Sequence, residues 1–403
     1  MYAGDTSPHV RSLQTGNLYD VIVVGARAAG AATAMLLARR GLRTLLLDRG
    51  ALRSDTLSTH ALLRGGVLQL ARFGLLDEIV AAGTPPVKRT TFRYGDERIV
   101  ISIKPSPGVD ALYAPRRTLL DPLLVRAAAD AGAHVYHRTT VTELIRRDGR
   151  VVGVHATTSD GRRVALGARL VIGADGIHST IARRVGATPS RVGLHKTATS
   201  YAYWSGLETD GYEWIFRPNA SAGVIPTNDG ETCVFACATP ERIGRGGLAV
   251  IDDIVTEAAP DLAARLRAAQ PPRRAYTWRG QPGFMRQAHG PGWALVGDAG
   301  YYKDPISAHG LTDALRDAEL LARAVVDGFG DDPSLREALD LYETTRDRLS
   351  VPLFDVVDRI ASQHWTGEEI GRLLLQVSSA TADEVELLAA LEPDPALLGS
   401  VAS

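Results

Sequence analysis

The chain has 403 residues, of which 45% are hydrophobic and 23% are charged. This length corresponds to roughly two or three domains, and this composition argues against disorder, collagen-like repeats and coiled coils. The 45 lysines and arginines almost balance the 46 aspartates and glutamates, so a net charge of −1 provides no overall field to attract nucleic acid.

Residues 1–18 show no hydrophobic periodicity and are predicted to be a flexible leader. They lack the apolar core of a signal peptide, and no stretch of the chain reaches the roughly 20 apolar residues of a membrane span. Cys233 and Cys237 lie four positions apart in an apolar run, a spacing typical of neither a disulfide framework nor a zinc site. We therefore expect a soluble protein of the cytoplasm with no metal and no membrane partner.

A strand, a helix and a second strand are predicted after this leader. Residues 19–24 form a β-branched run that ends at Gly25, residues 31–40 have a helical composition closed by Gly41, and residues 44–47 are a second apolar run. A right-handed crossover would make the two strands parallel neighbours. The pattern predicts an α/β fold with a doubly wound sheet.

The rest of the chain mixes strands with helices. Three of the later strands are separated by the turn signals Asp148-Gly149 and Asp160-Gly161, which predicts a meander inserted into the α/β scaffold. The C-terminal part is predicted to be mostly helical, with Pro352 and the pair Pro393 and Pro395 as interruptions. The expected ranges are a helix at 119–131, strands at 135–145, 150–158 and 162–166, a strand-rich block at 195–240, a strand at 293–296, a helix at 311–326 and helices from 334 onward.

The turn from Gly25 to Gly30 carries two of the three glycines of a dinucleotide-binding fingerprint. Arg27 stands where the second glycine is expected, and it would add a cation beside a diphosphate that the helix N-terminus already attracts. Asp48 ends the second strand, where a carboxylate would accept hydrogen bonds from an adenosine ribose. We predict a dinucleotide site here; an ordinary strand-turn-helix connection is the alternative.

Three segments together resemble the single-component aromatic hydroxylases typified by p-hydroxybenzoate hydroxylase. Residues 20–49 resemble the FAD-binding opening of that family, in the variant that has Arg for the second Gly. The segment Leu170–Ser179 resembles its central strand-turn motif, with Asp175 at the turn. The segment Trp293–Ala324 resembles its third motif, in which Asp298 would bind the ribityl hydroxyls.

The resemblance implies that FAD is the cofactor. Arg64 and Arg117 match positions where the family presents basic residues to FAD, although either could be a solvated helix residue. Ala308 stands where the family often has Gly, and the loop through Pro305 would deliver the next helix to the flavin. The predicted FAD-binding residues are Gly25, Ala26, Arg27, Ala29, Gly30, Asp48, Arg49, Arg64, Arg117, Val141, Asp175, Gly297, Asp298, Pro305, Ala308, Gly310 and Leu311.

The domain boundaries follow from these assignments. Residues 19–86, 110–190 and 280–330 are predicted to form the FAD-binding domain, and residues 87–109 and 191–279 the strand-rich substrate domain. The helical segment 331–403 would pack on the FAD domain or make an oligomer contact, in a monomer or a homodimer.

The resemblance also implies a reaction. The sequence contains no second dinucleotide fingerprint and no redox cysteine pair, so NAD(P)H would bind only transiently and without a Rossmann domain of its own. Reduced FAD and O2 would form a flavin C4a-hydroperoxide that hydroxylates or epoxidises an aromatic or polyketide-like small molecule. His60 and His309 lie in segments expected to flank the flavin and are the candidate catalytic residues.

An aromatic cluster marks the candidate substrate pocket. Tyr203 belongs to it, and Tyr212, Trp214 and Phe216 alternate so that they share one face of a strand. This face would form a wall for a flat apolar substrate or else pack the core of the second domain.

Three other functions remain open. A flavin-dependent halogenase would need a lysine after the first strand-helix-strand unit and a Trp-x-Trp-x-Ile-Pro stretch, and neither Lys88 nor the spacing of Trp204 and Trp214 meets this pattern. A prenyl-type double-bond reductase shares the FAD motifs. A catalytically silent protein that binds FAD or a partner is the third.

Overall fold

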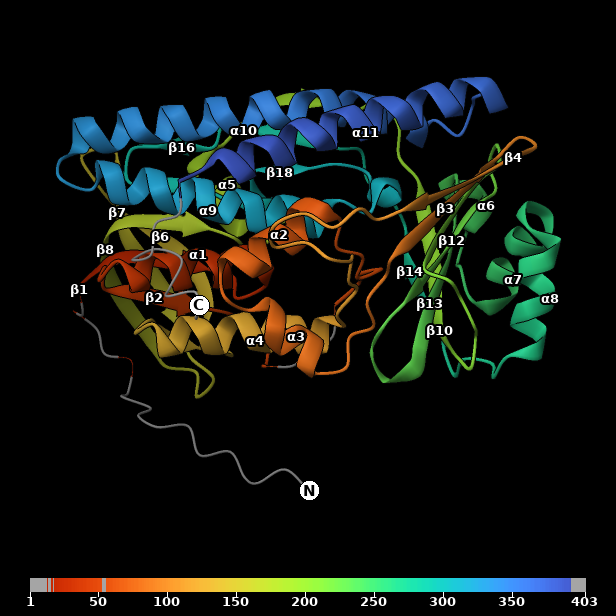
Figure 1. Ribbon diagram of the computed structural model, residues 1–403. Helices are drawn as coiled ribbons and strands as arrows, with labels where there is room; N and C mark the ends of the chain where they lie inside the picture. The colour runs from red at the N-terminus through yellow and green to blue at the C-terminus, as the bar shows by residue number, and fades with distance from the viewer. Residues whose placement is uncertain (1–12, 14–15, 17, 53–55, 393–403) are drawn as a thin grey trace.

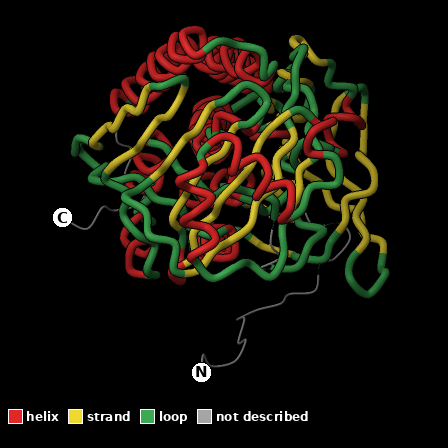
Figure 2. The backbone as a smooth tube through the Cα atoms, turned by 90° about the vertical axis from the view of Figure 1, so that its right-hand side faces the viewer, coloured by secondary structure: helices red, strands yellow, loops and turns green. Residues whose placement is uncertain are grey.

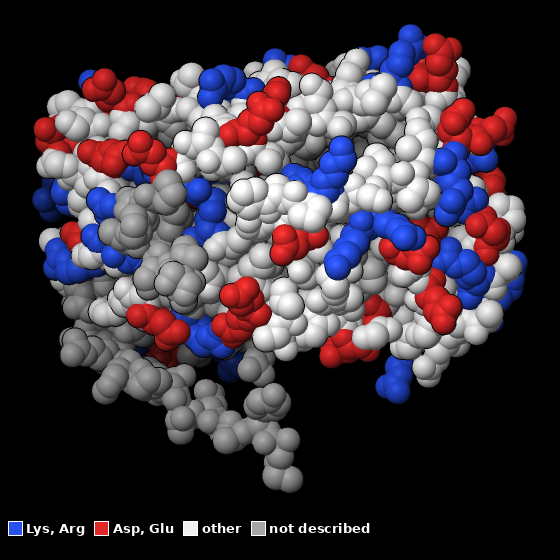
Figure 3. Space-filling model, viewed as in Figure 1, with Lys and Arg blue, Asp and Glu red and all other residues white. Residues whose placement is uncertain are grey.

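The computed structural model describes residues 13, 16, 18–52 and 56–392, and it contains a large mixed sheet, a second strand-rich sheet and a layer of C-terminal helices (Figure 1). Most of the predicted leader and the pair Pro393 and Pro395 lie outside the described residues. Leu13, within that leader, is buried against the first sheet. None of the described helices is long and apolar enough to cross a membrane. Positive and negative side chains are interspersed on the face seen in Figure 3.

The first sheet confirms the predicted α/β class. Its strands run in the order β16-β17-β8-β1-β2-β5, with β7 paired to β8 and β6 to β7. The pairs from β17 through β8, β1 and β2 to β5 are all parallel. The strands are β1 (Leu18–Val24), β2 (Thr44–Leu47), β5 (His134–Tyr136), β6 (Thr140–Arg147), β7 (Arg150–Thr157), β8 (Arg163–Gly173), β16 (His289–Gly290) and β17 (Trp293–Leu295).

Helices cover this sheet because their apolar faces need burial. Helix α1 (Ala28–Arg39) is buried along almost its whole length, and it packs between α4 (Arg117–Asp130) and α9 (Gly310–Gly328). Helix α2 (Arg64–Arg72) packs on α9, and α3 (Leu76–Ala81) follows it. Helix α5 (Thr180–Val185) begins just after β8 ends. The loops that follow β1, β2 and β8 lead into α1, α2 and α5, and they lie at the carboxyl ends of these strands.

The second sheet has the order β14-β10-β13-β12-β11-β3-β4. Its pairs are antiparallel except for the parallel pair of β11 and β3. Helices α7 and α8 cover one of its faces, as the right-hand side of Figure 1 shows. The elements are β3 (Arg89–Tyr94), β4 (Glu97–Ser102), β10 (Ala198–Ser205), β11 (Tyr212–Phe216), β12 (Ser221–Pro226), β13 (Glu231–Ala238), α6 (Pro240–Ile243), α7 (Leu248–Ala258), α8 (Pro260–Ala268) and β14 (Tyr276–Trp278).

A small sheet of β9 (Pro189–Val192), β15 (Phe284–Arg286) and β18 (Tyr301–Tyr302) also forms. Helices α10 (Asp332–Ala361) and α11 (Gly367–Ala390) lie along the top of the molecule in Figures 1 and 2. They pack on α9 and α2.

Two expectations about these elements were wrong. Pro352 does not interrupt a helix but lies inside α10. The carbonyl group left without its helical partner belongs to Arg348, an exposed residue, so the turn that lacks this bond lies at the protein surface. The range 135–145 is not one strand, because Arg138 adopts a φ of 51° and separates β5, which pairs with β2, from β6, which pairs with β7.

Candidate cofactor and substrate site

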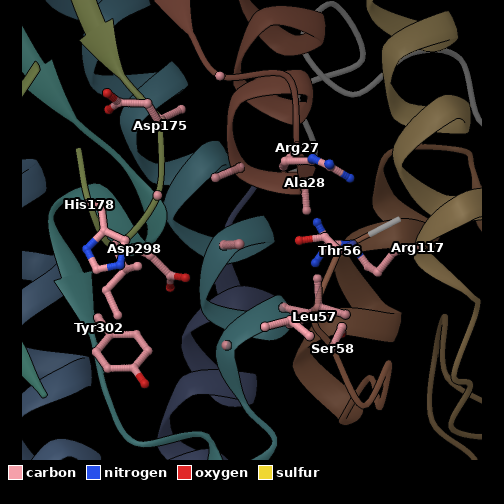
Figure 4. Close-up of a pocket in the computed structure, with 18 of the residues that line it drawn as sticks. Arg27, Ala28, Thr56, Leu57, Ser58, Arg117, Asp175, His178, Asp298 and Tyr302 are labelled. Atoms are coloured by element: carbon pink, nitrogen blue, oxygen red, sulfur yellow. The ribbon is translucent and has the colours of Figure 1, made fainter. Parts of the chain in front are cut away.

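One cavity of about 690 Å³ lies at the carboxyl ends of β1, β2 and β8 and extends to the second sheet. This is the crevice where open α/β sheets bind their ligands. In Figure 4, Arg27, the loop Thr56–Ser58 and Arg117 lie on one side, and Asp175, His178, Asp298 and Tyr302 lie on the other. The cavity is therefore built from segments far apart in the chain.

The turn between β1 and α1 leaves no room for side chains at its two glycines. Gly25 has a φ of 108°, and a Cβ there would lie 2.3 Å from the carbonyl oxygen of Ala174. A Cβ at Gly30 would lie 1.8 Å from the carbonyl oxygen of Gly25. No side chain caps the N-terminus of α1, so a phosphate group could accept hydrogen bonds from its first amides.

Asp48 lies where the sequence predicts the adenosine ribose. Its Oδ2 accepts a hydrogen bond from the backbone N–H of Ala26 at 2.7 Å, and its Oδ1 accepts one from that of Gly50 at 2.6 Å. A carboxylate has about four lone-pair positions, so Asp48 can accept further hydrogen bonds from ribose hydroxyls. Asp48, Arg49 and Val141 all line the cavity. Ala26 and Gly30 belong to the same turn but are not among the residues that line the cavity.

The two arginines carried over by position end in different places. Arg117 lines the cavity, and it shares the carboxylate of Asp121 with Arg27. Arg64 is not among the residues that line the cavity, because its guanidinium donates to Ser106 Oγ and to the carbonyl oxygen of Lys104, each at 2.8 Å. The contacts of Arg64 thus tie the start of α2 to the loop after β4.

Asp175 and Asp298 face the cavity from the ends of neighbouring strands. Asp175 accepts hydrogen bonds from Ser179 Oγ and from the amide of Thr180, at 2.5 and 2.6 Å, and burial raises its pKa. Asp298 is enclosed by protein, although water reaches it through the cavity. This enclosure raises its pKa to about 6, against the opposing effect of the nearby Lys303.

The segment after Asp298 forms the floor of the cavity. Pro305, Ala308, Gly310 and Leu311 all line it. Ala308 stands where the family often has glycine, and it adopts a φ of 50°. An alanine therefore takes the left-handed conformation that glycine would adopt without strain. Gly297 is not among the residues that line the cavity, and a Cβ there would come within 2.7 Å of the Ala29 side chain.

His60 also lines the cavity, and its backbone has a φ of 69°. Non-glycine residues with positive φ are uncommon and are enriched at functional sites. The Nε2 atom of His60 makes a short hydrogen bond with the hydroxyl of Tyr203, whereas Nδ1 is buried and has no partner among the described residues. Burial, assisted by Arg116 and Arg117, lowers the pKa of His60 well below its usual value. The imidazole is therefore neutral at neutral pH.

His309, the other candidate catalytic residue, is not among the residues that line the cavity. Its Nε2 lies 2.9 Å from Oε2 of Glu384, a residue of α11. The same carboxylate accepts a hydrogen bond from Arg316, 3.1 Å away, and Asp313 of the same cluster pairs with Lys303. His309 therefore belongs to a buried charge cluster at the cavity floor, in which Lys303 and Asp313 line the cavity and His309 does not.

The aromatic face of β11 is not brought to the cavity. The side chains of Tyr212, Trp214 and Phe216 pack in the large core, where Trp214 Nε1 donates to Thr90 Oγ1 at 2.9 Å. Phe216 meets Trp365 edge-on. This face of β11 is thus occupied by protein rather than open to a ligand.

Other residues of the second sheet and one of the small sheet do line the cavity, and they were not predicted to do so. Thr199 and Tyr201 come from β10 and Trp278 from the adjacent β14, while Tyr302 comes from β18 of the small sheet. The hydroxyl of Tyr201 accepts a hydrogen bond from the amide of Ser58 at 3.1 Å, which ties the loop before His60 to this sheet. The alternation of Thr199, Tyr201 and Tyr203 on one face of a strand is a signal that could have identified β10.

These residues fit FAD. The carboxylates of Asp48 and Asp298 line the cavity and can accept hydrogen bonds from ribose and ribityl hydroxyl groups. The uncapped N-terminus of α1 and the side chains of Arg27 and Arg117 can bind a diphosphate. The collisions that a Cβ would make at Gly25 and Gly30 show that helix and strand approach as closely as a dinucleotide turn requires.

Comparisons with known proteins point to the same cofactor. The model of the FAD binding domain family matches residues 18–355. A digeranylgeranylglycerophospholipid reductase of Methanothrix thermoacetophila is 26% identical over 332 residues, which are 80% of this chain and 82% of that protein. The structure of the flavin-dependent brominase Bmp2 aligns with a TM-score of 0.78 and 18% identity, over 94% of this chain and 95% of that one. PqsL, described as a probable FAD-dependent monooxygenase from Pseudomonas aeruginosa, aligns with a TM-score of 0.71 and 20% identity, over 91% of this chain and all of that one.

Proposed function

Because the chain belongs to the FAD binding domain family, we propose that it is an FAD-dependent monooxygenase that uses NAD(P)H and O2 to hydroxylate or epoxidise an aromatic or polyketide-like small molecule. Family membership confirms FAD as the cofactor and the resemblance to aromatic hydroxylases. The finer assignment, that of the reaction, rests on the geometry of the cavity.

The observation that carries the proposal is the continuity of the cavity. The residues at one end fit FAD, and those at the other end are Thr199, Tyr201, Trp278 and Tyr302 of the strand-rich part. Bound FAD would supply the redox chemistry with O2 and NAD(P)H. The protein would place an aromatic substrate beside it and keep bulk water away, because Tyr201, Tyr302 and His60 are almost fully buried.

His60 and Tyr203 are the groups best placed to move a proton at this end. If the Tyr203 hydroxyl donates to Nε2, Nδ1 carries the ring proton and can donate it; in the other tautomer Nδ1 is an acceptor. The neutral state of His60 allows either role at neutral pH. We assign proton exchange with a bound substrate to Nδ1, because it is the ring atom that no described residue engages.

NAD(P)H would have to reach the same cavity. The parallel sheet supplies one strand-turn-helix fingerprint among the described residues, and the second sheet is almost entirely antiparallel. A transient reductant is consistent with this arrangement. Cys233 and Cys237 are buried on β13 and unpaired, as in a reducing compartment, and we propose a cytoplasmic location.

A double-bond reductase is the second candidate, favoured by the resemblance to the Methanothrix reductase. A halogenase is favoured less, although Bmp2 shares the fold. Lys303 is the one lysine among the described residues that line the cavity, and its ammonium is paired with Asp313.

Isotope labelling distinguishes these reactions. The FAD-loaded protein would be supplied with NADPH or NADH and ¹⁸O2 and screened against phenols, aromatic acids and polycyclic polyketides. We expect substrate-stimulated NAD(P)H oxidation and a product that contains one ¹⁸O atom. A product that gains two hydrogens without O2 would identify a reductase instead. A product formed only with added bromide or chloride would identify a halogenase.

A further inference from the structure

Arg27 and Arg117 reach the cavity from different elements but share one carboxylate. Arg27 directly precedes α1, and Arg117 is the first residue of α4. Nη1 of Arg27 lies 2.8 Å from Oδ2 of Asp121, and Nε and Nη2 of Arg117 each lie 2.9 Å from Oδ1. The side chain of Asp121 is 7% exposed, and Asp121 is not among the residues that line the cavity. The carboxylate thus lies behind both guanidinium groups.

The charges of this trio suit a diphosphate. Both arginines line the cavity beside the uncapped N-terminus of α1, and Asp121 offsets one of their two positive charges. Asp121 itself carries the same sign of charge as the diphosphate, so by itself it would repel that ligand. Any benefit that it gives to FAD must therefore come through the arginines.

The geometry also explains how this chain accommodates Arg27 in place of a glycine. A long arginine side chain beside a ligand has many rotamers, and fixing one of them on binding reduces the affinity. The 2.8 Å contact with Asp121 fixes Arg27 in advance, and it carries the side chain away from the tight turn toward Arg117.

We propose that Asp121 is a positioning residue for FAD, which holds Arg27 and Arg117 against the cavity wall so that both guanidinium groups meet the diphosphate. This proposal depends on FAD binding and not on the monooxygenase reaction. It remains valid if the protein is a reductase or a halogenase.

A double-mutant cycle on FAD affinity tests it. FAD would be titrated into the apo forms of four full-length proteins: native, Asp121→Asn, Arg27→Met with Arg117→Met, and the triple variant. In the native background we expect Asp121→Asn to weaken FAD by about fivefold or more, since charge-assisted hydrogen bonds are lost. In the double-methionine background the same change should leave the affinity unchanged or improve it, because only the repulsive charge is then removed.

This reversal separates positioning from a general structural role. Equal losses in both backgrounds, or no loss in the native one, would overturn the proposal. Glu319→Gln is the matched control: Glu319 is a buried carboxylate that holds Arg72 and Gln69, and none of these three lines the cavity. It should lower the free energy of unfolding and change FAD affinity by less than about twofold.

A second variant covers the case in which Asp121→Asn does not fold. Asp121→Glu keeps the charge but moves the carboxylate by one methylene group. In the native background it should weaken FAD, and in the double-methionine background it should have no effect. Equal losses in the two backgrounds would again refute positioning.

Discussion

Replacing Tyr203 by Phe removes one buried oxygen atom beside His60, which lines the cavity, whereas Tyr203 itself does not. That oxygen is the hydrogen-bond partner of His60 Nε2, and His60 is 1% exposed. Because Nδ1 has no partner among the described residues, the variant would leave both ring nitrogens of a buried imidazole without a protein hydrogen bond. We expect the free energy of unfolding to fall by about 1–3 kcal/mol, the cost of an unsatisfied buried polar group. Arg116, which lies 3.7 Å above the Tyr203 ring, can stack on Phe equally well.

The functional effect should differ from the effect on stability. Tyr203 is not among the residues that line the cavity, and the substitution removes only the oxygen that bonds His60, so the FAD affinity of the Tyr203→Phe variant should stay within about twofold of the native value. If the pair moves a proton, substrate-stimulated turnover should fall by about tenfold or more, and its pH profile should change shape. The assays are urea unfolding, FAD titration, and NAD(P)H oxidation across the neutral pH range with the best substrate found.

Tyr342→Phe provides the control for this experiment. The Tyr342 hydroxyl is also buried and donates to the carbonyl oxygen of Leu295 at 3.0 Å, but Tyr342 does not line the cavity. It should lose about 1 kcal/mol of stability with an unchanged pH profile. If Tyr203→Phe behaves in the same way, the His60 pair has a structural role only and our proton-transfer assignment is wrong.

Three further predictions concern FAD and pH. Asp48→Ala and Asp298→Ala should each weaken FAD by about 1.5–3 kcal/mol in a titration, since each loses hydrogen bonds to a charged group; unchanged affinity in both would mean that the site is misplaced. Gly30→Ala should abolish FAD binding, because its Cβ would collide with the Gly25 backbone, whereas Gly330→Ala, with no atom nearby, should not. Burial raises the pKa of Asp304 to about 6, so its contribution to stability is full below about pH 4 and is lost as the pH rises through 6. Asp304→Asn should therefore remove a gain of about 1 kcal/mol between about pH 7 and 5 in chemical unfolding, and an unaltered pH dependence would contradict this.

Local patterns were sufficient for the part of the fold that binds the cofactor. The apolar runs at 19–24 and 44–47 with the helix between them predicted β1, α1 and β2, because a parallel unit of this kind has only one common topology. The helices α7 and α8 were not predicted, and Pro352 was assigned a break that α10 does not have. In the last case the turn that lacks one helical hydrogen bond lies at the surface around Arg348, a position that the local sequence does not reveal.

The substrate end of the cavity was harder to predict because it depends on strand pairing. Thr199 lies opposite Trp278 in the register of β10 and β14, although the two residues are far apart in the chain. Tyr212 and Trp214 looked equally suitable as a pocket wall, but β11 is paired between β12 and β3 and its aromatic face is covered by the core. Period-two alternation identifies the residues on a face, but it does not identify what covers that face.

One of the C-terminal helices, α11, supports the cavity floor through Glu384, although no described residue of α10 or α11 lines the cavity. The family match ends at residue 355, yet Glu384 of α11 contacts both His309 and Arg316, and His309 immediately precedes Gly310 on the cavity floor. A buried carboxylate is tolerated only with such partners, and removing it would leave Arg316 with one carboxylate fewer in a dry interior. The start of α9, which lines the cavity, is thus held by a helix much further along the chain. Helix α11 is therefore held against the FAD-binding part by these charged contacts as well as by apolar packing.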